Sequence, residues 1–131
     1  MRAQLAFISE IKWPFMKLTN VVLDKSYDFS LKIVKLHLFM TKELKQFELS
    51  RQLLKSGTSI SANIEESQGA CRRGIFRNKM SIAYKEARET MYWHKLLRDA
   101  SIVRVEILSP LLADCKQLLR PLYSIVSSSR K

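Results

Sequence analysis

Apolar residues recur every three or four positions along most of this 131-residue chain, which is the spacing of an α-helix with one buried side. Short polar runs divide the pattern into four long stretches. The three glycines and three prolines are too few for the many turns of a sandwich or barrel. We therefore expect an all-α fold, an antiparallel up-down-up-down four-helix bundle. Its helices should cover about residues 24–41, 50–69, 73–100 and 104 to near the C-terminus.

The first stretch carries two apolar stripes, whereas a surface helix normally has one. Two sets of four residues form these stripes: Phe29, Ile33, Leu36 and Met40, and Tyr27, Leu31, Val34 and Leu38. One stripe can meet the rest of its own bundle. The other stripe requires a different partner.

Length and composition indicate one folded domain, which we place at residues 17–131. A hydrophobic fraction of 47% is ordinary for a globular protein and excludes a disordered chain. Cys71 and Cys115 are the only cysteines, and they form neither a zinc-site pattern nor a disulfide framework. The expected compartment is the reducing cytoplasm.

Residues 1–16 form an N-terminal extension of this domain. Their apolar side chains at Leu5, Ile8, Ile11 and Phe15 share a helical face, which is typical of an amphipathic surface helix or a docking segment. Translation from a codon upstream of a true start at Met16 explains the segment equally well. Polar residues interrupt the apolar run, so it is neither a signal peptide nor a membrane span, and a membrane partner is not expected.

The formal net charge is +11 and the pI is near 10.0, with the basic excess spread along the whole chain. Such a surface attracts anionic partners, of which nucleic acid is the most common and a membrane surface the next. A basic protein that binds nothing specific is the other interpretation.

The segment SISANIEESQGACRRG, residues 59–74, connects the second and third predicted helices. Gly57, Ser59, Ser61 and Ala62 are small, and Gly57 falls on the buried side of its helix, so another backbone can approach closely there. Close helix packing is favoured over a catalytic role for the serines. Gly69 is the predicted helix-ending residue.

Charges in this corner oppose the local helix dipoles. Glu65 and Glu66 lie near a helix C-terminus, and Arg72 and Arg73 lie near an N-terminus. We predict that one of the two glutamates pairs with one of these arginines or with a basic residue of another helix or subunit. Asn63 should hydrogen-bond to nearby backbone or to a side chain.

A candidate nucleic-acid site follows directly, because residues 67–81 contain four basic residues and no acidic one. The predicted phosphate contacts are Arg72, Arg73, Arg77 and Lys79. Since no sequence-reading motif is present, binding should depend on charge and shape, weaken with salt and show little sequence preference.

Motifs for catalysis or metal binding are missing from the sequence. Neither His37 nor His94 has the Glu-x-x-His spacing of a di-metal bundle, and His94 on an apolar stripe is more typical of a packed, hydrogen-bonded histidine. Cys71 lies beside two arginines but has no assignable base. Glu86 and Glu89 should be solvated or make ion pairs between helices. We expect no enzyme activity, no cofactor and no metal.

Three segments, SLKIVKL, LSRQLLKSGTSISANIEESQGA and KMSIAYKEARETMYWHKLL, together resemble the bacterial four-helix bundle protein family, also called 23S ribosomal RNA intervening-sequence proteins. The resemblance extends from about Lys17 to the C-terminal helix. It is carried by two sets of residues: Ser59, Ala62, Asn63, Glu65 and Gly69 in the second helix, and Glu86, Glu89, Trp93 and Leu97 in the third.

The resemblance implies an antiparallel four-helix bundle that assembles as a ring-like homopentamer. It also implies a relation to the basic accessory proteins of diversity-generating retroelements, which bind a reverse transcriptase and nucleic acid. The expected function is thus a non-enzymatic, oligomeric, nucleic-acid-associated protein. The alternative is a protein-interaction scaffold that binds an acidic or reverse-transcriptase-like partner without touching nucleic acid.

Overall fold

The computed structural model of the chain describes residues 16–129. Within that range the fold is all-α, with four helices and no strand: α2 (Met16–Lys42), α3 (Glu48–Ser67), α4 (Arg73–Asp99) and α5 (Val105–Ser129). The predicted fold class is confirmed at this level. Residues 1–15, with the predicted apolar face of the extension, lie outside the described residues.

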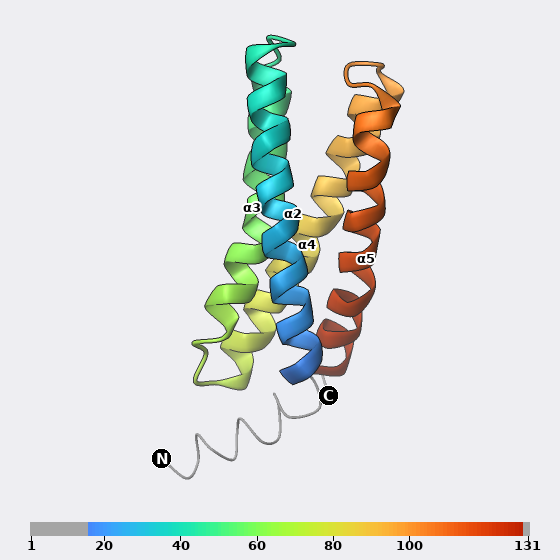
Figure 1. Cartoon of the computed structure of the whole chain (residues 1–131). Helices are drawn as coiled ribbons and strands as arrows, with labels where there is room; N and C mark the ends of the chain where they lie inside the picture. Colours follow the sequence, from blue (N-terminus) through green and yellow to red (C-terminus); the bar gives the residue numbers. More distant parts are fainter. Residues whose placement is uncertain (1–15, 130–131) are drawn as a thin grey trace.

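Short connections join consecutive helices. The connections at residues 43–47 and 100–104 lie at one end of the molecule, and the connection at 68–72 lies at the other (Figure 1). α2 packs against α3 and α5, and α4 packs against the same two helices. Lys45 (φ 56°) and Ser101 (φ 58°) adopt left-handed backbone conformations, which reverse the chain after α2 and α4 without a glycine.

The core contains one apolar stripe from α4 and one from α5. Seven residues of α4 are buried at helical spacing: Phe76, Met80, Ala83, Ala87, Met91, His94 and Leu97. α5 contributes a second row: Leu108, Leu111, Leu112, Cys115, Leu118, Leu122, Ile125 and Val126. α5 continues through Pro110 and Pro121. None of the helices in the described range is long and apolar enough to cross a bilayer.

α2 begins at Met16, two turns earlier than the sequence pattern indicates. The segment before Asp24 contains Leu18, Val22 and Leu23, of which Val22 is fully buried and the other two pack against the core. Sequence reasoning placed the start too late because these positions precede the repeating double stripe.

The two stripes of α2 have separate environments. Phe29, Ile33, Leu36 and Met40 are buried in the core. The second stripe is exposed to different degrees: Tyr27 by 59%, Leu31 by 48%, Val34 by 38% and Leu38 by 45%. The prediction that only one stripe packs within the chain is confirmed.

Gly57 of α3 packs closely against Ile33 of α2. A Cβ atom at this position would lie 2.9 Å from both Cγ1 and Cγ2 of Ile33, closer than packed side chains approach one another. Ser56 lies next to it and accepts a hydrogen bond from Thr90 of α4 at 3.0 Å. Small residues in α3 therefore allow close packing against both neighbours, as the sequence predicts.

Candidate nucleic-acid interface

The corner between α3 and α4 brings the predicted basic residues to one end of the molecule. α3 ends at Ser67, and Gln68 and Gly69 form the turn that follows. Gly69 lies just past the helix, as the sequence predicts, and its φ is not positive. Hydrogen bonds from the N–H groups of residues 68–70 to the carbonyls of residues 65–67 close the turn.

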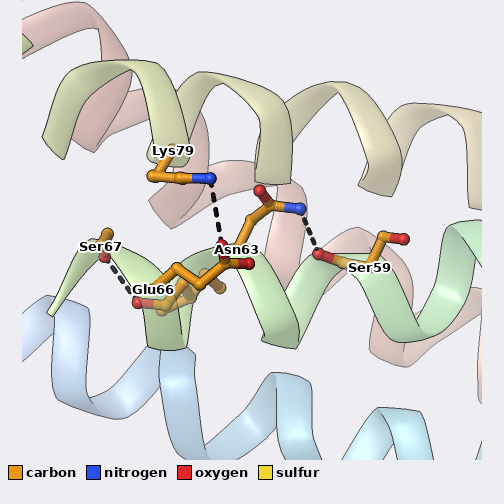
Figure 2. Close-up of polar contacts among 6 residues, drawn as sticks. Ser59, Asn63, Glu66, Ser67 and Lys79 are labelled. Carbon is orange, nitrogen blue, oxygen red and sulfur yellow. Dashed lines mark hydrogen bonds and ion pairs between the residues drawn. The ribbon is translucent and has the colours of Figure 1, made fainter. Parts of the chain in front are cut away.

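Glu66 makes the ion pair that the sequence predicts. Its Oε1 lies 3.1 Å from Nζ of Lys79, across the gap between α3 and α4 (Figure 2). The partner is a basic residue of another helix, which was one of the predicted possibilities. The cation offsets the unfavourable position of a carboxylate at a helix C-terminus.

Asn63 makes a hydrogen bond to the backbone, as predicted. Its Nδ2 donates to the backbone carbonyl of Ser59 at 2.8 Å, one turn earlier in the same helix (Figure 2). The hydroxyl of Ser59 in turn donates to the carbonyl of Lys55 at 2.6 Å. Both side chains therefore bond to the backbone of α3, one turn earlier in the same helix.

Arg72, Arg73 and Arg77 lie exposed around the start of α4. Arg72 precedes the helix in an extended conformation, and the first turn of α4 contains no acidic residue. Lys79 is less exposed than the arginines and pairs with Glu66. The structure thus places all four predicted contacts at one corner. The three arginines are exposed there, and the lysine is partly buried in its ion pair with Glu66.

The motif acids of α4 are partly buried. Glu89 accepts a hydrogen bond from Nε1 of Trp93 at 3.3 Å, one turn along the helix. Partial burial and, to a smaller extent, the charge of Glu89 raise the pKa of Glu86. Lys85 of α4 and Lys55 of α3 lower it. Glu86 therefore interacts with a charge on α3, while Glu89 and Trp93 are bonded to each other within α4, and none of the three belongs to the basic corner.

The remaining reactive side chains are held in structural contacts or lie apart from one another. His94 is fully buried, and its Nδ1 donates to the Thr90 carbonyl at 2.9 Å, which confirms the expectation of a packed histidine. Burial raises the pKa of the Cys115 thiol to about 12, whereas Cys71 is exposed. Across residues 16–129, no cluster of three or more His, Cys, Asp or Glu side chains is arranged to hold a metal ion.

Two grooves run beside the helices, and they carry opposite charges. A groove of about 790 Å³ between α2 and α3 contains Asp24, Asp28 and Glu65 beside Tyr27 of the exposed stripe. A second groove, about 390 Å³, lies between α4 and α5, and its cations are Arg88, Lys95 and Lys116.

Sequence reasoning missed the second groove as a functional candidate. The spacing of Arg88, Tyr92 and Lys95 along one side of α4 was a signal available in the sequence. Which residues of α5 would face them depends on how the two helices pack, and the spacing within α4 contains no information on that.

Comparison with known proteins agrees with this architecture. Residues 19–124 match the family described as 23S rRNA-intervening sequence protein. A crystal structure of a protein of unknown function from the S23 ribosomal protein family of Bacteroides thetaiotaomicron is 43% identical in sequence, with a TM-score of 0.80. The similarity covers 83% of this chain and 97% of that one. None of the curated proteins matches. Because the family match spans most of the described helices, the chain belongs to the 23S rRNA-intervening sequence protein family.

Proposed function

We propose that the protein is a non-enzymatic, cytoplasmic nucleic-acid-associated protein that binds RNA or an RNA–DNA hybrid with low sequence specificity. The observation that carries the proposal is the α3–α4 corner, where Arg72, Arg73 and Arg77 are exposed and residues 67–81 include no acid. Glu66 does not neutralise this corner as a whole, since Lys79 pairs with it. The family description, which refers to 23S rRNA, is consistent with an RNA partner.

The unit of this function is an up-down-up-down bundle that assembles into a homopentameric ring. Alternation of the connections between the two ends of the molecule supports the up-down order (Figure 1). The exposed stripe of α2 supports assembly, because contiguous exposed apolar surface usually marks an interface. A closed ring covers such surface on every copy and brings several basic corners together, which strengthens binding to a long polyanion.

Binding to a labelled rRNA fragment, measured across a salt series, tests the proposal. Wild-type protein should bind at about 50 mM salt and lose affinity steeply toward 200 mM, as expected when phosphate contacts release counterions. The double variant R72E/R73E should bind more weakly at every salt concentration. Absence of binding at the lowest salt concentration would sink the nucleic-acid proposal. Equal binding by the variant would exclude this corner while leaving the function in place.

The second candidate is a scaffold for a protein partner, such as a reverse-transcriptase-like enzyme. It is favoured by the exposed stripe of α2, which is apolar and therefore unsuited to nucleic acid. Affinity capture from nuclease-treated lysate separates the two candidates. A partner that persists after nuclease treatment supports the scaffold, and a partner that disappears supports nucleic-acid binding.

A further inference from the structure

The groove between α4 and α5 is a basic surface distinct from the α3–α4 corner. Six residues line it: Arg88, Met91, Tyr92, Lys95, Lys116 and Leu119. They supply three cations, one aromatic ring and two apolar side chains, and no carboxylate lies among them. Its volume of about 390 Å³ falls within the range of sites that hold small organic groups.

Three carboxylates of α4 and α5 are bonded to residues that do not line this groove. Asp114 of α5 forms an ion pair at 2.7 Å with Lys32 of α2. Glu89 of α4 accepts the hydrogen bond of Trp93, and Asp99 pairs with the neighbouring Arg98. No carboxylate lines the groove itself, although the charge of Asp99 interacts with one of its cations, Lys95, one turn earlier in α4.

Tyrosine rings accompany these cations. Tyr84, Arg88, Tyr92 and Lys95 follow one another at helical spacing along α4, and Tyr123 of α5 lies with its ring centroid 5.9 Å from that of Tyr84. Tyr92 and Tyr123 remain 57% and 58% exposed. Each ring touches another aromatic ring, yet more than half of its surface stays exposed, which leaves room for a flat group to pack against it.

Contacts within the protein hold these side chains in place. Nη1 of Arg88 donates to the hydroxyl of Tyr84 at 3.3 Å, and the Arg88 guanidinium lies 5.9 Å from the centre of that ring. The ring of Tyr92 meets that of Trp93 edge-on, with centroids 5.1 Å apart. Because the Trp93 side chain is itself bonded to Glu89, this contact restricts Tyr92.

We propose that this groove binds a single-stranded segment of nucleic acid. Arg88, Lys95 and Lys116 contact the phosphates, and Tyr92 stacks on an unpaired base. Stacking requires a free base face, which a duplex hides, whereas cations alone would serve a duplex equally well. An acidic protein segment would also meet these cations, so it enters the test below as a competitor. This inference rests on the proposed function and names its ligand class.

The test measures binding of a labelled oligouridine and of a blunt duplex of equal length to the full chain. Tyr92→Ala should weaken oligouridine binding roughly 5- to 150-fold, the equivalent of about 1–3 kcal/mol for one stacked base, and leave duplex binding unchanged. Tyr92→Phe keeps the ring and should bind like wild type. Phe47→Ala removes an equally exposed ring outside the groove and serves as the matched control.

Lys116→Gln should lower the slope of log affinity against log salt by about one, since one phosphate contact is lost. Unchanged oligouridine binding by Tyr92→Ala, or equal weakening of the duplex, overturns the proposal. Failure of Tyr92→Phe to bind overturns it too, because the hydroxyl rather than stacking would then be responsible. Effective competition by a polyglutamate peptide of equal charge assigns the groove to acidic protein instead. If neither oligouridine nor duplex binds wild type at low salt, the proposed function itself fails.

Discussion

The two apolar stripes of α2 resemble each other in composition but differ in environment. Ile33 is fully buried, while Leu31, two residues away on the same helix, is 48% exposed. Helix propensity cannot explain the difference, because both residues lie in one continuous helix. Burial of the first stripe stabilises the single chain, whereas the second contributes only when another molecule covers it. We therefore predict that folding and assembly depend on separate faces of one helix, and substitutions can test each face alone.

The largest loss of unfolding free energy is expected from a substitution in the buried stripe. Ile33→Ala should lower the free energy of unfolding by about 2–5 kcal/mol, because it removes buried methyl groups and leaves a cavity. Leu31→Ala is the matched substitution on the exposed stripe. Urea unfolding at several protein concentrations checks the pair. Ile33→Ala should shift the midpoint equally at every concentration, whereas the effect of Leu31→Ala should depend on concentration. An equal, concentration-independent loss in both variants would contradict the division of α2 into two faces.

A smaller loss is expected where α3 meets the buried stripe. Gly57→Ala places a methyl group 2.9 Å from two atoms of Ile33, and the β-branched side chain has little freedom to move away. The helix preference for alanine offsets part of this cost, so we expect a net loss of about 1 kcal/mol in unfolding free energy. The double variant G57A/I33A checks the contact. It should be more stable than the sum of the single effects predicts, and strict additivity would exclude direct coupling.

Lowering the pH should reduce the free energy of unfolding, because His94 is buried in the core. Burial lowers its pKa, and the hydrogen bond of Nδ1 to Thr90 leaves Nε2 as an unprotonated acceptor inside the core. Stability is fully present above the unfolded-state pKa of about 6.5, and it falls as pH drops from there toward the lower folded-state value.

Lowering the pH from neutral to about 5.5 should therefore reduce the free energy of unfolding. His94→Gln should remove most of this pH dependence, which urea unfolding at the two pH values measures. If the variant retains the full pH dependence, another group is responsible.

The sequence predicts the fold well because burial of apolar stripes dominates helix packing. The α4 stripe from Phe76 to Leu97 and the division of α2 follow from spacing alone. The early start of α2 and the ending of α3 at Ser67 without a left-handed glycine depend on tertiary contacts and local turn geometry, which spacing does not encode.

The basic corner was predictable because Arg72, Arg73 and Arg77 are close in sequence. Pairing of Glu66 was also predictable from unfavourable helix dipoles, although the choice of Lys79 depends on how α3 and α4 align. The α4–α5 groove was not predictable, since Arg88 and Lys116 meet only through the packing of two helices.

The smallest effect on folding is expected from charges placed on the exposed stripe. The double variant L31D/V34D should change the unfolding free energy of the single chain by about 0.5 kcal/mol or less, because both side chains already face solvent. It should nevertheless disrupt assembly, since two carboxylates would be buried without partners at each interface. Circular dichroism should show unchanged helix content.

The molar mass of the full chain in solution, measured by light scattering during size-exclusion chromatography, tests the separation of folding from assembly most directly. We predict that the wild type has several times the 15.3 kDa mass of one chain, five times for a pentamer, and that L31D/V34D has the mass of one chain. A wild-type mass of 15.3 kDa, or an assembly that survives in the variant, would contradict the assignment of the exposed stripe of α2 to contacts between copies.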